Sequence, residues 1–214
     1  MVYRLAKERM VWAIAAGSAG DVYLATGTDG RIYHRSPEGQ MRLLFDAPEP
    51  SIQALALDRQ GNLYAGAGPG GVIYRVSPAG KATVFFRTRQ RYVLSLVIDA
   101  SGNLYAGTGG AGRILRFAPD GQGAESFTTR EPHVLRLALD SKGALLAGTA
   151  EQGVVYRITA PGQGTAVMDT GDRAVGGLAV DRDGRVVAGT APRGLILREG
   201  EARPPPAGQA TVLA

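Results

Sequence analysis

The feature that most constrains this sequence is a set of turn glycines that recur at a fixed interval. Gly20, Gly61, Gly102, Gly143 and Gly184 are each separated from the next by 41 residues. The last four close D-x-x-G turns, each of which follows one apolar run and precedes another. Aspartate at the start of such a turn accepts hydrogen bonds from the backbone ahead of it, and glycine at the end supplies positive φ. The glycine interval therefore divides the chain into five similar units.

Each unit is expected to form four short antiparallel strands. A run such as "IQALAL" leads into the D-x-x-G turn, "NLYAG" follows, and then come "GVIYRV", a P-x-G turn and "ATVFF". A period near 40–50 residues with four strands is typical of a propeller blade. We predict an all-β, five-bladed β-propeller as one domain over 1–214. Its closing strand lies at 1–10, and its blades cover about 11–50, 51–91, 92–132, 133–173 and 174–214.

A glycine motif in the third unit has the spacing of a dinucleotide loop. Gly107, Gly109 and Gly112 spell G-x-G-x-x-G, but a phosphate-binding loop must lead into a helix N-terminus, whereas here the strand "RILRF" follows. The same spacing occurs one unit earlier. We interpret both as hairpin turns.

Units such as "GNLYAGTGGAGRILRFAPDGQGAESF" resemble bacterial β-propeller repeats of the NHL-repeat and WD-repeat-like type. The resemblance covers nearly the whole chain from Val11 onward. It implies the propeller architecture but no particular activity, because propellers carry many unrelated functions.

Two stretches compete to provide the strand that closes the ring. "VYRLAKERMVWAI" aligns with "VFFRTRQRYVLSL", which makes Val2 to Ala6 an outer strand placed before the first blade. The C-terminal "PAGQATVLA" aligns with "PAGKATVFF" and is a second candidate. We favour the N-terminal strand as the clasp. The surplus strand then lies outermost or pairs with another molecule.

Composition and charge narrow the range of functions. The formal charge of +5 is spread among interspersed acidic and basic residues, so nucleic-acid binding is not favoured. Because there is no cysteine, disulfides and thiolate metal sites are excluded. The basic and then apolar N-terminus has the order of a signal peptide, but we interpret it as strands and expect a cytoplasmic protein without membrane contact.

Two sets of repeated side chains have a structural interpretation. The third strands carry His34, Arg75, Arg116, Arg157 and Arg198 at one position. We expect these cations to pair with the aspartates that end the first strands rather than to bind an external anion. Repeated tyrosines on the second and third strands are expected to pack in the core.

Candidate binding residues lie where the units differ, on the loops that enter each first strand. These loops should meet the second-to-third strand turns on one face, and loops on a rigid scaffold concentrate binding residues. The candidates are Trp12, Gln53, Arg89, Arg91, Tyr92, Arg130, His133 and Arg136. Such a basic, aromatic surface suits a peptide, a protein or an anionic small molecule. We expect a monomer, with a strand-mediated oligomer as the alternative.

Three functions follow from these observations. The first is a non-catalytic binding or scaffolding propeller with a ligand or acidic peptide at the loop face. The second is an enzyme similar to propeller lyases or lactonase-like hydrolases. We rank it lower because His133, with Glu131 and Glu49 as partners, lacks an orienting third group. The third is a designed, reconstructed or fragment propeller without a specific ligand. No catalytic residue, metal or cofactor is predicted.

Overall fold

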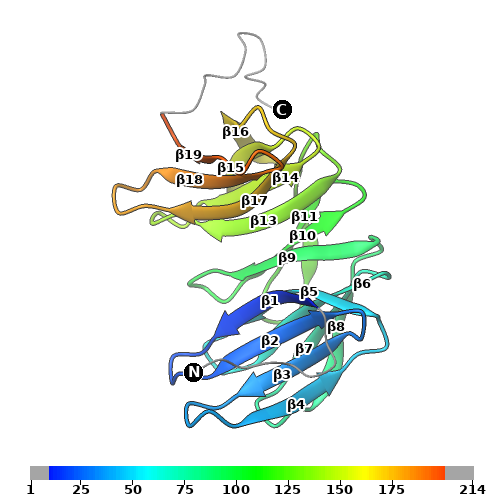
Figure 1. The fold of residues 1–214 in the computed structure, drawn as a ribbon. Helices are drawn as coiled ribbons and strands as arrows, with labels where there is room; N and C mark the ends of the chain where they lie inside the picture. Colours follow the sequence, from blue (N-terminus) through cyan, green and yellow to red (C-terminus); the bar gives the residue numbers. More distant parts are fainter. Residues whose placement is uncertain (1–9, 201–214) are drawn as a thin grey trace. The chain divides into compact units, whose positions relative to one another are not determined.

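In the computed structural model, which describes residues 10–200, every helix or strand is a β-strand (Figure 1). The chain divides between Leu96 and Val97 into two compact units, and each is described by itself. All strand pairings within the two units are antiparallel. The all-β prediction is confirmed for this part of the chain. No helix that could cross a membrane is present among these residues.

The first unit contains two complete four-stranded sets. The first set is β1 (Met10–Ala16), β2 (Val22–Gly27), β3 (Arg31–Arg35) and β4 (Met41–Asp46). The second set is β5 (Ser51–Leu57), β6 (Leu63–Gly68), β7 (Val72–Val76) and β8 (Ala82–Arg87). Consecutive strands pair within each set, and the pair Gly27 and Ser51 links β2 to β5. β9 (Tyr92–Ile98) begins in this unit and ends in the next.

The second unit continues with the same order of strands. It contains β10 (Leu104–Gly109), β11 (Arg113–Phe117), β12 (Gly123–Thr128), β13 (His133–Leu139), β14 (Leu145–Ala150), β15 (Val154–Ala160), β16 (Gln163–Asp169), β17 (Ala174–Val180), β18 (Val186–Ala191) and β19 (Ile196–Arg198). Two single pairs link neighbouring sets: Gly109 pairs with His133, and Ala150 pairs with Ala174. These links bring the start of one set next to the second-to-third strand turns of its neighbours.

The sequence period is also present in the backbone and in the core. A β-bulge interrupts β1 between Val11 and Ala13, and the same bulge recurs 41 residues later between Ile52 and Ala54. The second residue of the third strand is fully buried in four successive sets: Ile32, Ile73, Ile114 and Val155. Because one face of each strand meets a neighbouring sheet, the same apolar position is buried each time.

The predicted turns have the expected hydrogen bonds. Asp99 Oδ1 accepts the backbone N–H groups of Ser101 and Asn103, each at 2.9 Å, and Gly102 has φ +83°. The G-x-G-x-x-G stretch runs from β10 into the hairpin before β11, where Gly112 has φ +63°. A Cβ at Gly112 would lie 2.1 Å from the Glu131 carbonyl oxygen, so no larger residue fits. The hairpin interpretation is confirmed.

The cation column on the third strands is mainly structural. His34 Nε2 lies 2.6 Å from Asp21 Oδ1, and Arg198 Nε donates to Asp181 Oδ2 at 2.6 Å. Arg116 departs from the prediction, because Nη2 donates to the Asn103 amide oxygen at 2.9 Å and not to an aspartate. Arg75 lies over the Tyr64 ring at 5.9 Å from its centroid. Four tyrosines of the repeated set are buried, as expected: Tyr23, Tyr64, Tyr74 and Tyr156.

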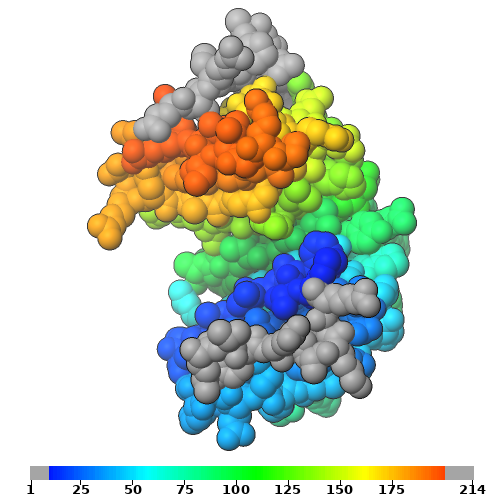
Figure 2. Space-filling model, viewed as in Figure 1, coloured from blue at the N-terminus to red at the C-terminus, as the bar shows by residue number. Residues whose placement is uncertain are grey.

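Strand β1 leaves apolar side chains exposed on the first unit, where its dark-blue segment lies at the surface in Figure 2. Met10, Val11, Trp12 and Ile14 are 45–65% exposed. The predicted closing strand at 1–10 lies outside the described residues apart from Met10, which begins β1. The competing C-terminal stretch at 206–214 lies outside them entirely.

Candidate functional site

In the first unit, three of the predicted binding residues gather around Gly68 at the end of β6. The Tyr92 ring packs against the bare Cα of Gly68, and the Gln53 amide oxygen lies beside it. The Arg91 guanidinium stacks over the Tyr92 ring at 5.3 Å from its centroid. The Gln53 Oε1 atom is buried and has no hydrogen-bond partner among the described residues. These three residues form a small polar and aromatic cluster.

The other two predicted residues of this unit lie apart from that cluster in their local surroundings. Trp12 of β1 packs over Gly27, where a Cβ would lie 1.8 Å from the indole nitrogen. Arg89 lies in the loop between β8 and β9 with φ +57°, and its side chain is exposed. Neither residue makes a hydrogen bond or ion pair printed for the described part of the first unit, so both stay candidates on the sequence argument alone.

In the second unit, the strand pairing places His133 between two hairpin turns. His133 begins β13 and is paired with Gly109 of β10 on one side and Ala150 of β14 on the other. The turns after those strands therefore flank the imidazole. The Gly110 backbone N–H donates to His133 Nδ1 at 3.2 Å, and His133 Nε2 lies 4.0 Å from Glu151 Oε1. His133 thus has a fixed ring nitrogen and a carboxylate facing the other one.

The geometry assigns the proton of the neutral imidazole. Because Nδ1 accepts the Gly110 N–H, it carries a lone pair, and Nε2 carries the hydrogen. That N–H points toward Glu151, whose side chain is 60% exposed, while the His133 side chain is 36% exposed. An N–H donor and a carboxylate therefore stand side by side at an accessible surface.

Glu151 occupies a backbone position that favours glycine. Its φ is +83°, and the same turn position 41 residues earlier is Gly110, with φ +116°. A side chain in this region costs on the order of 1 kcal/mol relative to glycine. Strained residues of this kind cluster at functional sites, where the side chain has a use that outweighs the cost.

The two carboxylates named with His133 from the sequence, Glu131 and Glu49, have other partners. The Tyr74 hydroxyl donates to Glu49 Oε2 at 2.8 Å, and burial together with this hydrogen bond raises the pKa of Tyr74 to about 12. Burial and the Glu131 carboxylate likewise raise the pKa of Tyr156 well above its ordinary value. Glu131 is only 4% exposed, and its Oε2 atom has no hydrogen-bond partner within residues 10–200. Both carboxylates are core partners of tyrosines.

The remaining two predicted residues of this unit differ in role. Arg136 Nε donates to the Gly176 carbonyl oxygen at 2.8 Å, and Nη1 donates to the Leu135 carbonyl oxygen at 2.7 Å. The guanidinium therefore braces β13 against β17. Arg130 is exposed, and its charge acts on the Tyr156 hydroxyl. Of the predicted residues in the second unit, His133 has the surroundings of a reactive group.

Sequence reasoning missed Glu151 as the partner of His133. A usable signal was present, because the 41-residue period aligns Glu151 with Gly110 in a turn that favours glycine. A charged residue there indicates a side chain kept for its chemistry. Within residues 10–200, no three or more histidines and carboxylates gather in a way that could hold a metal ion.

Comparison with known proteins adds information about the fold. No protein-family model matches the sequence, and no curated protein matches it. Solved structures do match. A streptogramin B lyase is 18% identical with a TM-score of 0.76, and the match covers 93% of this chain and 70% of that one. These neighbours are β-propellers. The chain has a propeller fold.

Two further neighbours are enzymes. A catalytically inactive histidine-to-alanine variant of virginiamycin B lyase from Staphylococcus aureus, with quinupristin, is 16% identical at a TM-score of 0.74, covering 95% of this chain and 74% of that one. A gluconolactonase-family protein is 17% identical at a TM-score of 0.63, covering 83% and 70%. These matches overturn the expectation of a non-catalytic binding or scaffolding propeller, and they favour the lyase or lactonase-like alternative. At such low identity, the likeness itself shows only the fold.

Proposed function

We propose that this protein is an enzyme of the propeller lyase or lactonase-like hydrolase type, with His133 and Glu151 as its catalytic residues. The observation that carries the proposal is the arrangement of the imidazole, with Nδ1 held by Gly110 and Nε2 4.0 Å from the Glu151 carboxylate. Two titratable groups with different roles in one accessible place are what acid–base catalysis requires.

The two side chains divide the work. The Nε2–H of His133 donates to a carbonyl oxygen of the substrate and stabilises the negative charge that develops there. The Glu151 carboxylate takes a proton. The close spacing lets both groups act on one substrate group, because apo hydrogen bonds commonly tighten when substrate binds.

Two reaction outcomes use this geometry. In an elimination, Glu151 removes a proton from the carbon next to the carbonyl group, the C–H electron pair forms a carbon–carbon double bond, and the C–O bond to the leaving group breaks. In a hydrolysis, Glu151 removes a proton from water, the water oxygen attacks the carbonyl carbon, and the ester C–O bond breaks. Either reaction needs the same donor and base.

The neighbours support this proposal. One is a lyase that is inactive when a single histidine becomes alanine, and another belongs to a gluconolactonase family. Quinupristin and gluconolactone are therefore the first probes. Incubating each probe with the wild-type protein and weighing the products separates the two reactions. Elimination leaves the summed mass unchanged, and hydrolysis adds the mass of one water.

Finer features of the fold belong to the same proposal. We propose five blades of NHL-like type with the boundaries stated from the sequence, within one domain. The four-stranded order of β1–β4, β5–β8 and β13–β16 supports those boundaries. A small substrate at the loop ends of the blades fits this architecture, since binding residues concentrate on such loops.

A further inference from the structure

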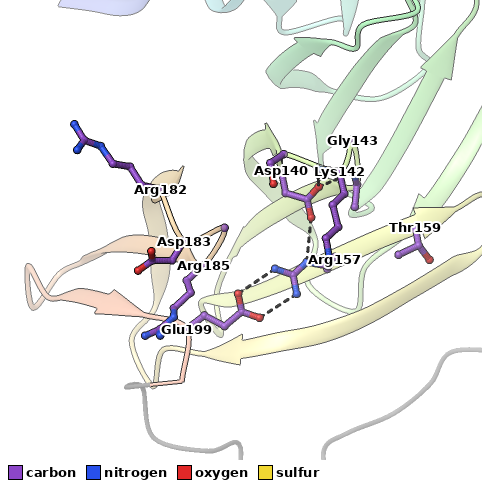
Figure 3. Close-up of a pocket in the computed structure, with 12 residues that line it drawn as sticks. Asp140, Lys142, Gly143, Arg157, Thr159, Arg182, Asp183, Arg185 and Glu199 are labelled. Carbon is purple, nitrogen blue, oxygen red and sulfur yellow. Dashed lines mark hydrogen bonds and ion pairs between the residues drawn. The ribbon is translucent and has the colours of Figure 1, made fainter.

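A pocket of about 710 Å³ lies in the second unit at the opposite end of β13 from His133. The seven residues of β13 separate the two ends by about 20 Å, at roughly 3.3 Å per residue. The turn after β13, the turn after β17 and strand β15 supply most of its lining, with Glu199 at the end of β19 (Figure 3). The catalytic proposal makes no use of this end of the blades.

A closed ion-pair group forms part of the pocket. Arg157 of β15 makes a bidentate pair with Glu199, in which Nη1 and Nη2 each donate at 3.0 Å. Arg157 Nε lies 3.5 Å from Asp140 Oδ2 without forming a hydrogen bond, and this nitrogen is buried. Asp140 also accepts the backbone N–H groups of Lys142 and Ala144. The two carboxylates are thus already engaged, while one buried N–H lacks an acceptor.

Three further basic residues line the same pocket: Lys142, Arg182 and Arg185. Their side chains make no ion pair or hydrogen bond printed for the described residues, and all three are exposed. The remaining carboxylate, Asp183, accepts a hydrogen bond from Arg198 at 2.8 Å. Figure 3 shows Lys142 beside Arg157 in this view and Arg182 extending outward at the edge. The uncompensated charge of the pocket is therefore positive.

The equivalent pocket one repeat earlier gives an internal comparison. It has a volume of about 290 Å³ and is lined by Asp99, Asn103, Tyr105 and Arg116, among others. Arg116 is its one basic lining residue, and it is bonded to Asn103. At the turn positions of Lys142, Arg182 and Arg185, that repeat has Ser101, Ala100 and Asn103. The excess of basic residues is thus particular to the larger pocket and does not follow from the turn itself.

We propose that this pocket binds a small phosphorylated molecule that carries hydroxyl groups, in the manner of a sugar phosphate. Lysine and arginine side chains bind phosphate through charge-assisted hydrogen bonds. Ser141 and Thr159 line the same space and offer hydroxyl partners for the rest of the ligand. The volume lies within the range of small-molecule sites, roughly 300–1,000 Å³.

The test is isothermal titration of the full chain with glucose 6-phosphate, glucose and gluconate. Wild-type protein should bind glucose 6-phosphate at least tenfold more tightly than either other compound. The variant K142S/R182A/R185N takes each residue from the same turn position one repeat earlier, so the turns should keep their conformation. It should lose at least tenfold in affinity for glucose 6-phosphate.

Arg59→Ala is the matched control, because Arg59 has the turn position of Arg182 in the first unit and lines neither pocket. Its affinity should stay within twofold of wild type. His133→Ala should also bind normally, which separates this proposal from the catalytic one. Equal affinity for glucose 6-phosphate and glucose would overturn the proposal, as would equal affinity for gluconate or full binding by the triple variant. Circular dichroism and the melting temperature verify that each variant is folded.

Discussion

His133 Nε2 and Glu151 Oε1 lie 4.0 Å apart although the two residues come from different elements, the start of β13 and the turn between β14 and β15. The pairing of His133 with Ala150 produces this proximity, because Ala150 is the last residue before the turn. Any change in that register would separate the pair. Side-chain chemistry here depends directly on strand alignment.

Glu151→Gly should stabilise the protein while removing activity. The φ of +83° suits glycine, so the substitution should raise the free energy of unfolding by about 1 kcal/mol. Thr28→Gly is the matched control, since Thr28 occupies the same turn position in the first unit with φ +76°. Denaturant unfolding should show a gain for both, and only E151G should lose turnover. A loss of stability in E151G would contradict the strain argument.

Gly112→Ala should be strongly destabilising. The position has φ +63°, and the added Cβ would lie 2.1 Å from the Glu131 carbonyl oxygen, so we expect a loss of about 3 kcal/mol or more. Gly143→Ala has a similar φ of +83° but meets nothing within 4 Å, so it should lose only about 1 kcal/mol. Equal losses by urea unfolding would show that the close contact has no weight.

The Arg157–Glu199 pair should make stability depend on acid. Burial alone would raise the pKa of Glu199, but the hydrogen bonds from Arg157 and the Val186 N–H outweigh it and lower that pKa. A lowered pKa in the folded state contributes stability above the unfolded value, about 4.3, and the contribution is lost as pH falls through the folded value. Melting temperatures measured from pH 7 to 3 should therefore fall more steeply in wild type than in Glu199→Gln. Parallel curves would contradict this assignment.

The Tyr74–Glu49 hydrogen bond should appear in an alkaline titration. The pKa of Tyr74 is raised to about 12, so the folded state is favoured below the unfolded value near 10, and this contribution is lost as pH rises through 12. Difference absorbance of phenolate should show a late-titrating tyrosine that is missing in Tyr74→Phe. Glu49→Gln should move that titration to lower pH. An unchanged spectrum in Y74F would show that another tyrosine gives the signal.

The sequence predicted the strands and turns well because both depend on short-range physics. The D-x-x-G turns, the hairpin at Gly112 and the buried tyrosines follow from local hydrogen bonding and from the repeat. The partner of His133 was not predicted, because the contact between His133 and Glu151 depends on the register of β13 against β14. Arg116 was assigned to an aspartate for the same reason: which of two nearby acceptors it reaches, Asp99 or Asn103, depends on side-chain reach across the sheet.

The most direct test of the central claim is the turnover of quinupristin and gluconolactone by His133 variants. The account predicts that wild type converts at least one probe and that His133→Ala lowers kcat/KM by about 100-fold or more. The chain's other histidine gives the control: His34→Arg, which inserts the residue found at that position in the other repeats, should retain full activity. Undiminished turnover in folded H133A, or no conversion of either probe by wild type, would contradict the account.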